Sequence, residues 1–260
     1  MAESLERAEH LRRQMVSDIA HELRTPLTTI QAYLDACEDG VLEPGPAIIL
    51  SLQEEAMLLA RLVADLQELS IAEAGHLKLD CTPLALERCL HAAMQSVQAG
   101  AREKHVTLAV EVLADLPFVT ADAGRVGQIL RNLLTNALTH TPAGGTITVS
   151  AVCRDREVEV SIKDTGSGIA PEHVPYLFER FYRADVSRSR KTGGTGLGLA
   201  IVKQLVKPMA VTFELKAHRV REPAFSLPCP SNEHMRPDTG AHDRSTWVLS
   251  FIEIVGLPAK

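Results

Sequence analysis

The chain has 260 residues and a formal net charge of −6 at pH 7, and 45% of its residues are hydrophobic, 23% charged and 4% aromatic. These values are typical of a globular protein with an aliphatic core and room for two small domains. They exclude the dense basic patch that nucleic-acid binding requires, so no nucleic-acid partner is expected.

The five cysteines are scattered along the chain, and none of them forms a CxxC pair. A zinc site and a disulfide framework are therefore not indicated, and a reducing, cytoplasmic setting is expected. The sequence shows no signal peptide and no apolar run near the ~20 residues of a membrane span. Any membrane sensor that acts with this polypeptide is expected to lie outside it.

The first predicted helix covers residues 3–37, which contain no glycine and one proline, Pro26. His21 lies opposite the apolar stripe of this helix, at about 100° per residue, and is expected to face solvent. A core histidine is thereby disfavoured. Because Pro26 has no N–H, the carbonyl of Glu22 loses its helical partner and a bend is expected there. The stripe repeats at spacings of three and four: Met15, Ile19, Leu23, Leu27, Ile30 and Leu34.

A second predicted helix follows the turn-like stretch EDGVLEPGP (38–46). Its apolar residues repeat like a heptad seam, continued by Ser70: Leu52, Ala56, Leu59, Val63 and Leu66. One helical hairpin cannot bury two apolar stripes well, so the sequence predicts a homodimer with a four-helix bundle. The alternative is a hairpin that packs on its own second domain.

The pattern changes after AGH (74–76), where a domain boundary is predicted near residue 75. HLKLD (76–80) and VTLAVEVL (106–113) alternate like strands, and helices are predicted at 84–100 and 124–139. TITVSAV and EVEVSIKD predict a hairpin around residues 154–156. Strands mixed with helices favour an α+β two-layer sandwich, with one sheet covered on one face.

Two polar clusters lie in this second domain. Asn132 and Asn136, in RNLLTNALTHT, share a helix face, where their amide oxygens suit either Mg²⁺ or hydrogen bonds to a neighbouring loop. In DTGSGI (164–169), Gly166 and Gly168 permit a tight turn close to a ligand, and Asp164 is an acceptor suited to an amino group such as that of adenine. Taken alone, this second cluster is better explained as an ordinary Asp-Gly turn.

The third cluster is GGTGLGLAIV (193–202), in which Gly194, Gly196 and Gly198 lead into a helical run. Backbone N–H groups at such a helix N-terminus can bind an anion. No GK[ST] follows and no strand precedes, so neither a Walker loop nor a dinucleotide motif is present. The polar, basic stretch 178–194 suits a mobile lid over phosphates or a solvated loop.

Together, the order Asn…Asn, DxGxG, basic lid and GxGLGL resembles the four nucleotide-binding boxes of the GHKL ATPases. These include histidine kinases, gyrase-type topoisomerases, a heat-shock chaperone and mismatch-repair ATPases. The words FERFYR and HELRTPL point within this group to the sensor histidine kinases of two-component systems. The resemblance covers residues 10–206 and implies a dimerisation and phosphotransfer domain at 1–74, an ATP-binding domain at 75–206 and an atypical tail at 207–260.

The resemblance also implies roles for three residues of the HELRTPL word. His21 matches the histidine that ATP phosphorylates and that passes the phosphoryl group to an aspartate of a response regulator. Glu22 matches the general base, and Thr25 matches the position implicated in dephosphorylating the regulator. A neutral imidazole is a competent nucleophile at neutral pH.

In the ATP-binding domain, the resemblance makes Asn136 the Mg²⁺ ligand, with Asn132 its neighbour in the same box. Asp164 would read adenine, and Arg183 would contact the terminal phosphate. Thr139 departs from a frequent lysine of the family. The glycines would shape the adenine pocket and the phosphate loop: Gly166, Gly168, Gly194, Gly196 and Gly198.

The resemblance stops after residue 206, where the family continues with EAHGG and two further strands. This chain reads KPMAVTFELKA, yet an alternate codon frame of VKPMAVTF permits EAHGGHV, which predicts a frameshift near residues 206–207. The alternative is a divergent C-terminus, in which VTFELKA and WVLSFIEIV supply substitute strands. Missing strands would leave the core face of the domain uncovered and its sheet edge open.

The sequence thus predicts an ATP- and Mg²⁺-dependent protein histidine kinase that acts as a homodimer on a response regulator. One alternative is an impaired kinase-like module that still dimerises or binds a regulator, as the tail would favour. Another is a different GHKL ATPase that uses ATP for conformational work, against which the HELRTPL word argues. The sequence names neither the stimulus nor the regulator.

Overall fold

The structure, a computed structural model, describes residues 2–75, 77–112, 116–154, 157–184, 194–207, 209, 212–219 and 248–257. The chain divides into two compact units, of residues 1–77 with 177–201 and of residues 78–176 with 202–260. The division after residue 77 lies close to the boundary predicted near residue 75. The segment 177–201, by contrast, groups with the helices, although its sequence assigned it to the ATP-binding domain.

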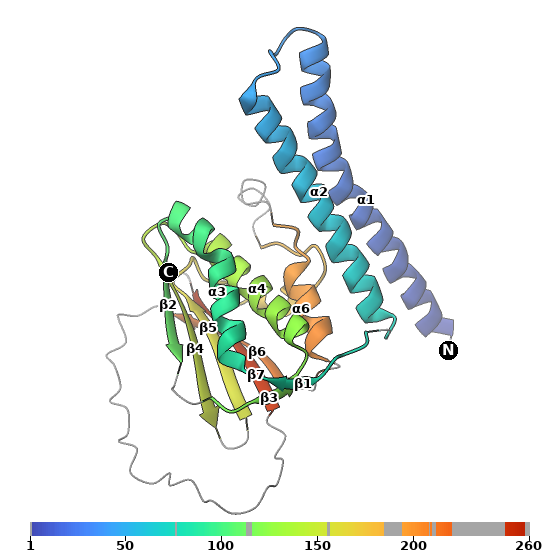
Figure 1. The fold of residues 1–260 in the computed structure, drawn as a ribbon. Coiled ribbons are helices and arrows are strands. Elements are labelled where there is room, and N and C mark those ends of the chain that lie inside the picture. The colour runs from blue at the N-terminus through green and yellow to red at the C-terminus, as the bar shows by residue number, and fades with distance from the viewer. Residues whose placement is uncertain are drawn as a thin grey trace, which may run out of the picture. The chain divides into compact units, whose positions relative to one another are not determined.

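The first unit is built on a hairpin of two long helices, α1 (Ala2–Glu38) and α2 (Pro46–Glu73) (Figure 1). The α-helix α1 continues through Pro26. Helix α2 starts with Pro46 in its first turn, where the missing N–H of proline costs no helical hydrogen bond. Among the described residues, no helix has the length and apolar character that crossing a membrane would require.

The apolar residues of the hairpin are only partly covered within one chain. Leu62 and Leu69, seven residues apart on α2, are buried. The seam predicted on α2 for pairing with a second copy is not the face that is buried in a single chain. Its residues are all half-buried or exposed: Leu52, Ala56, Leu59, Val63, Leu66 and Ser70. On α1, Leu27 and Leu34 are likewise 49% and 52% exposed. The hairpin therefore has apolar residues that are buried, Leu62 and Leu69, and others that one chain leaves exposed, such as Leu27 and Leu34.

The second unit holds a five-stranded sheet in the order β2-β4-β5-β7-β6 and a two-stranded sheet of β1 and β3. In the larger sheet β4 and β5 are antiparallel, and the other neighbouring strands are parallel. The strands are β1 (Thr82–Leu84), β2 (Thr107–Val112), β3 (Val119–Ala121), β4 (Thr146–Arg154), β5 (Glu157–Asp164), β6 (Thr212–Arg219) and β7 (Val248–Leu257).

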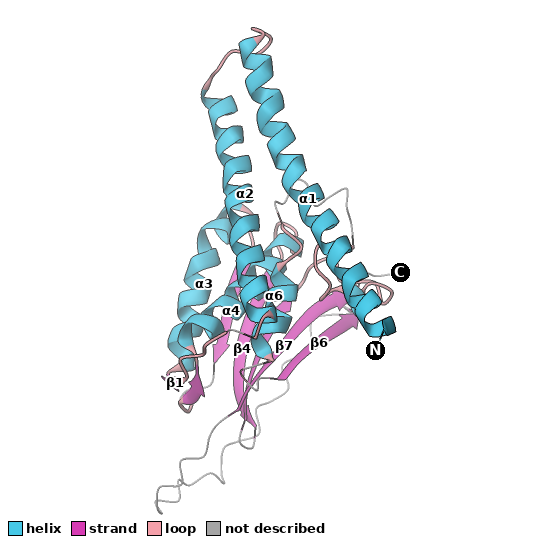
Figure 2. Cartoon of the chain, turned by 90° about the vertical axis from the view of Figure 1, so that its right-hand side faces the viewer, coloured by secondary structure: helices cyan, strands magenta, loops and turns pink. Residues whose placement is uncertain are grey.

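Helices α3 (Leu86–Glu103) and α4 (Ala123–His140) cover one face of the larger sheet (Figure 1 and Figure 2). Asp122 caps α4 by accepting a hydrogen bond from the backbone N–H of Arg125 at 3.1 Å. A short 3₁₀ turn, η1 (Val174–Tyr176), lies in the same unit, and α6 (Gly198–Val206) begins in the first unit and ends in the second. The core is aliphatic, as predicted, and includes Leu90, Ile129, Leu130, Leu133, Leu134, Ile147, Val149 and Ile162.

The predicted α+β two-layer sandwich is confirmed, with two local differences. The predicted strand HLKLD is not one, because the described residues 77–80 pair with no strand. Instead the backbone N–H of Asp80 donates to the Asp122 carboxylate at 3.0 Å. In the tail, β7 pairs with β5 and β6 pairs with β7, so the segments VTFELKA and WVLSFIEIV do contribute strands.

The frameshift near residues 206–207 stays a hypothesis, because strand pairing does not report the codon frame. The polar stretch 228–245 lies outside the described residues. With β6 and β7 in place, the sheet extends beyond β5, which removes the open edge expected from missing strands at that position.

We expect Leu34→Glu to weaken self-association, because it places a charge on the apolar face that a single chain leaves 52% exposed. Burying a leucine contributes about 1.5–3 kcal/mol, so losing one from each copy should raise the dimer dissociation constant more than about tenfold. Size-exclusion chromatography with light scattering measures this. Gln31→Glu, at another exposed position of α1, is the matched control. A monomeric wild type, or a variant that dimerises as well as the wild type, would contradict the expectation.

Candidate functional site

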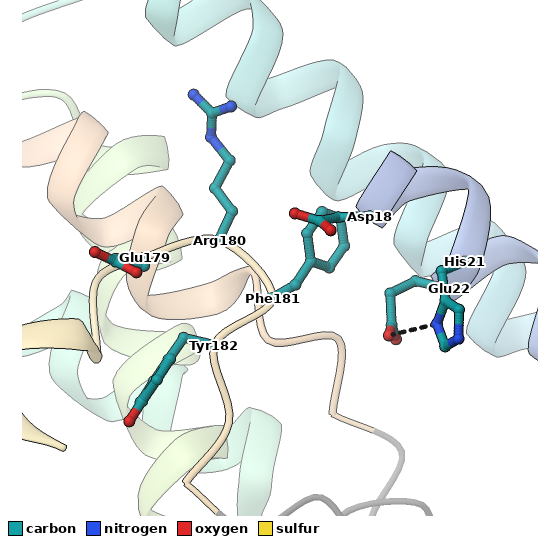
Figure 3. A pocket seen from close by; sticks show the side chains of 7 residues that line it. All are labelled: Asp18, His21, Glu22, Glu179, Arg180, Phe181 and Tyr182. Atoms are coloured by element: carbon teal, nitrogen blue, oxygen red, sulfur yellow. Dashed lines mark ion pairs between the residues drawn. The ribbon is translucent and has the colours of Figure 1, made fainter. Parts of the chain in front are cut away.

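His21 stands on α1 as predicted from the apolar stripe, with its side chain 73% exposed. Its Nδ1 lies 3.7 Å from Oε1 of Glu22, the next residue, whose side chain is 34% exposed (Figure 3). The carboxylate therefore faces Nδ1, and Nε2 is the ring nitrogen that it does not face. One turn further on, Thr25 is exposed, and its hydroxyl donates to the backbone carbonyl of His21 at 3.3 Å.

His21 and Glu22 line an open pocket of about 320 Å³. One side of it comes from α1, which also contributes Asp18, and the other from residues 179–182 (Figure 3). The pocket is mostly polar, with Phe181 and Tyr182 as its aromatic members. The histidine thus lies in a recess that already has charged groups of both signs, including Arg180.

Among the described residues of segment 177–201, Arg180 and Thr195 bind to the hairpin. Arg180 donates to the Glu73 carboxylate and to the sulfur of Met15, so it joins the end of α2 to α1. Thr195 donates from its hydroxyl to the Asp65 carboxylate at 2.9 Å. Burial raises the pKa of Asp65, and the Thr195 hydrogen bond partly offsets this. Sequence reasoning assigned no role to Arg180, Asp65 or Thr195, because only the fold brings residues so distant in the chain together.

Arg183 belongs to the same region of the first unit. Burial lowers the pKa of its guanidinium, and the negative charge of Glu22 acts in the opposite direction, so the two side chains are electrostatically coupled. A Cβ on Gly194 would lie 3.7 Å from the Arg183 guanidinium. The structure therefore brings together His21, Glu22, Arg183 and Gly194, four of the residues singled out by sequence.

The backbone geometry at Gly196 explains why the GGTGLGL motif has a glycine at this position. Its φ is +69°, and a Cβ would lie 2.9 Å from Cα of Phe181, whose N–H donates to the Gly196 carbonyl at 3.0 Å. Gly198 is the first residue of α6. Most of the predicted lid, residues 185–193, lies outside the described residues.

The second unit holds the other predicted site residues. Asp164, at the end of β5, is 3% exposed, and its Oδ1 accepts the backbone N–H of Gly166 at 2.7 Å. Burial raises the pKa of the Asp164 carboxyl, and the Gly166 hydrogen bond acts against that shift. A Cβ on Gly166 would lie 2.5 Å from that oxygen, so the loop closes on the carboxylate only with glycine there. Gly168, with φ +73°, follows in the same loop.

The Asp164 loop rests on the C-terminal end of α4. The backbone N–H of Ser167 donates to the His140 carbonyl at 3.4 Å, and the missing Cβ of Gly166 would come within 2.7 Å of the same oxygen. Asn136 and Asn132 lie one and two turns before His140 on that helix, and both are half-buried. The structure thus places the two polar clusters of this domain at the same helix end.

These groups are chemically suited to a nucleotide with a divalent cation. Among the described residues, no group of three or more His, Cys, Asp or Glu side chains could hold a metal ion. Asn136 can offer one hard amide oxygen, and the remaining oxygens of a Mg²⁺ shell would come from phosphates and water. The buried carboxylate and its glycine-lined loop form a small acceptor site suited to an amino group.

Comparisons with known proteins agree with this arrangement. Residues 11–75 match the His Kinase A (phospho-acceptor) domain, and residues 121–240 match the histidine kinase-, DNA gyrase B-, and HSP90-like ATPase. The chain is 38% identical over 211 residues to the signal transduction histidine-protein kinase BaeS of Escherichia coli, covering 80% of this chain and 44% of BaeS. It therefore spans less than half the length of that curated relative.

Two solved structures are also similar. The histidine kinase AdeS of Acinetobacter baumannii matches with a TM-score of 0.61 and 28% identity, over 72% of this chain and 85% of that one. Full-length ShkA, in complex with AMPPNP, matches with a TM-score of 0.55 and 29% identity, over 76% of this chain and 41% of that one. With both domain matches in the order that the sequence predicted, the chain belongs to the sensor histidine kinases of two-component systems.

Proposed function

We propose that this chain transfers the terminal phosphoryl group of ATP to His21 and then to an aspartate of a response regulator. The observation that carries the proposal is an exposed imidazole with a carboxylate 3.7 Å from its Nδ1, on the chain that also holds a buried Asp164 in a glycine loop. Membership of the sensor histidine kinases supports it, because that family combines the same two domains.

His21 would act as the nucleophile through Nε2, since Glu22 faces Nδ1. As the bond between Nε2 and phosphorus forms, the bond from phosphorus to the oxygen of ADP breaks. The proton on Nδ1 then becomes acidic, and Glu22 is placed to accept it. Arg183, coupled electrostatically to Glu22, supplies a positive charge that would offset the negative charge of the phosphates.

Asp164 would accept a hydrogen bond from the adenine amino group, and Gly166 and Gly168 keep the backbone close enough for that contact. Asn136, with Asn132 in the same box, would hold the Mg²⁺ that neutralises phosphate charge. Gly194, Gly196 and Gly198 would approach the phosphates with backbone N–H groups. AMPPNP, bound to the similar ShkA, is an ATP analogue and supports this assignment.

Thr25 lies one helical turn after His21 and would help to place a water molecule when the regulator is dephosphorylated. A homodimer is supported by the phospho-acceptor domain match and by the exposed apolar face of the hairpin. The second candidate function is an impaired module that dimerises or binds a regulator without catalysis. The KPMAVTFELKA word, which stands after residue 206 where the family has EAHGG, favours it. The ATPase-domain match, which runs to residue 240, and the pairing of β6 and β7 into the sheet argue against it.

We expect the full chain to become labelled by γ-³²P-ATP with Mg²⁺, and the label to be acid-labile and base-stable, as a phosphohistidine is. His21→Gln should abolish the label. His91→Gln is the matched control, because His91 is also exposed and also lies 3.7 Å from a glutamate, Glu87. No label on a folded dimer would favour the impaired module, and label that persists in His21→Gln would contradict the proposed acceptor.

We expect Asp164→Asn to weaken ADP binding about 10- to 100-fold, because it replaces a charged acceptor of the adenine amino group. The free energy of unfolding of Asp164→Asn at pH 7 should, in contrast, be higher than that of the wild type. The folded-state pKa of Asp164 is raised, so stability falls as pH rises from the unfolded-state pKa through the folded-state pKa, and the ionised carboxyl is destabilising at neutral pH. Calorimetry and thermal unfolding at pH 7 measure both effects, with the exposed Asp80→Asn as control.

The affinity of the wild type for ADP should also fall on acidification at a higher pH than an ordinary aspartate would give, because the pKa of Asp164 is raised by burial. Titrations of ADP binding across the acid range test this. Asp164→Asn should lack this step in its pH profile. A wild-type profile identical to that of the variant would show that Asp164 does not read the nucleotide.

A further inference from the structure

We propose that Lys104 is a positioning residue for the nucleotide site, because its ammonium group fixes the last turn of α4, on which the Asp164 loop rests. This role rests on the proposed function, since it concerns the nucleotide held by that loop. Lys104 lies at the end of α3, 60 residues before Asp164 in the chain. It has no place in any of the four nucleotide-binding motifs.

The last four carbonyls of an α-helix have no partner within the helix. In α4 each of them has a specific partner. The Ala137 carbonyl accepts the N–H of Thr141 at 2.9 Å, and the His140 carbonyl accepts the N–H of Ser167 at 3.4 Å. The two between them, Leu138 and Thr139, both accept from Nζ of Lys104, each at 2.7 Å. Lys104 therefore satisfies half of this helix end, and the Asp164 loop takes its final carbonyl.

The charge of Lys104 suits this position. The C-terminus of a helix carries partial negative charge, which a cation stabilises. Burial lowers the pKa of the Lys104 ammonium, because its charge is partly removed from water. The surroundings are tightly joined, because the His105 carbonyl accepts the N–H of Gly144 at 2.8 Å. A Cβ on Gly100 would lie 3.2 Å from the Leu138 side chain.

A displacement of the last turn of α4 would also displace the Asp164 loop. The His140 carbonyl contacts both Gly166 and Ser167, and Gly166 in turn holds the Asp164 carboxylate through its N–H. Without Lys104, two carbonyls lose their partners and the last turn of α4 is free to fray. The Asp164 loop would then lose its fixed support, and Asn136 lies only one turn away.

The test measures binding of ADP with Mg²⁺ to the full chain by calorimetry, together with thermal unfolding. We expect Lys104→Met to weaken ADP binding about tenfold, because two charge-assisted hydrogen bonds are lost. Lys104→Arg, which can still donate to both carbonyls, should bind ADP nearly as well as the wild type. Lys78→Met, at an exposed lysine of the same unit, should have no effect.

A readout independent of affinity is amide hydrogen exchange. In Lys104→Met we expect faster exchange at Thr141 and Ser167, the two N–H groups bonded to the end of α4. A folded Lys104→Met that binds ADP like the wild type would overturn the proposal, even if it unfolds at a lower temperature. So would a Lys104→Arg variant as weak as Lys104→Met. If Lys104→Met does not fold, Lys104→Gln takes its place under the same criteria.

Binding of ADP by the wild type distinguishes a failure of this proposal from a failure of the proposed function. If the wild type binds no ADP, the nucleotide site itself is refuted and the role of Lys104 with it. If the wild type binds ADP and Lys104→Met binds equally well, only the positioning role is refuted.

Discussion

The histidine at position 21 has to remain exposed on a helix whose opposite face must be buried. Helix α1 meets both demands through its periodicity, which directs the apolar stripe to one side and leaves the imidazole 73% exposed on the other. The helices α1 and α2 leave apolar residues such as Leu34 uncovered, which supports the proposed homodimer. An exposed imidazole and an uncovered apolar face are thus two consequences of one amphipathic helix, as the proposed phosphoacceptor and homodimer require.

In the second unit, by contrast, an ionisable side chain, Asp164, lies in the interior of the domain. Asp164 is nearly fully buried, and the cost of burying its charge appears as a raised pKa. The carboxylate is held by Gly166, and the loop is held by the end of α4, whose carbonyls Lys104 satisfies. The position of the buried carboxylate therefore depends on helix-end hydrogen bonds as well as on the strand that carries it.

Segment 177–201, which contains the FERFYR word, binds to the helical hairpin that carries His21. The motifs alone do not predict this contact. Arg180 and Thr195 attach the segment to both helices of the hairpin, and Arg183 is coupled to Glu22. The proposed general base, Glu22, and the guanidinium of Arg183 thus belong to the same unit. Residues between these anchors belong to the basic stretch that the sequence marked as a lid.

The sequence by itself determined the two long helices, the exposure of His21, the α+β class of the second domain and the glycine loops, because periodicity and glycine motifs are local properties of the chain. It missed the buried pair Leu62 and Leu69, since a helix with two apolar faces does not reveal which face its own chain fills. It also took HLKLD for a strand, because alternation cannot show whether a partner strand exists. The contacts of Lys104, Arg180 and Asp65 were decided by tertiary structure alone, because each joins residues more than 30 positions apart, which no local pattern encodes.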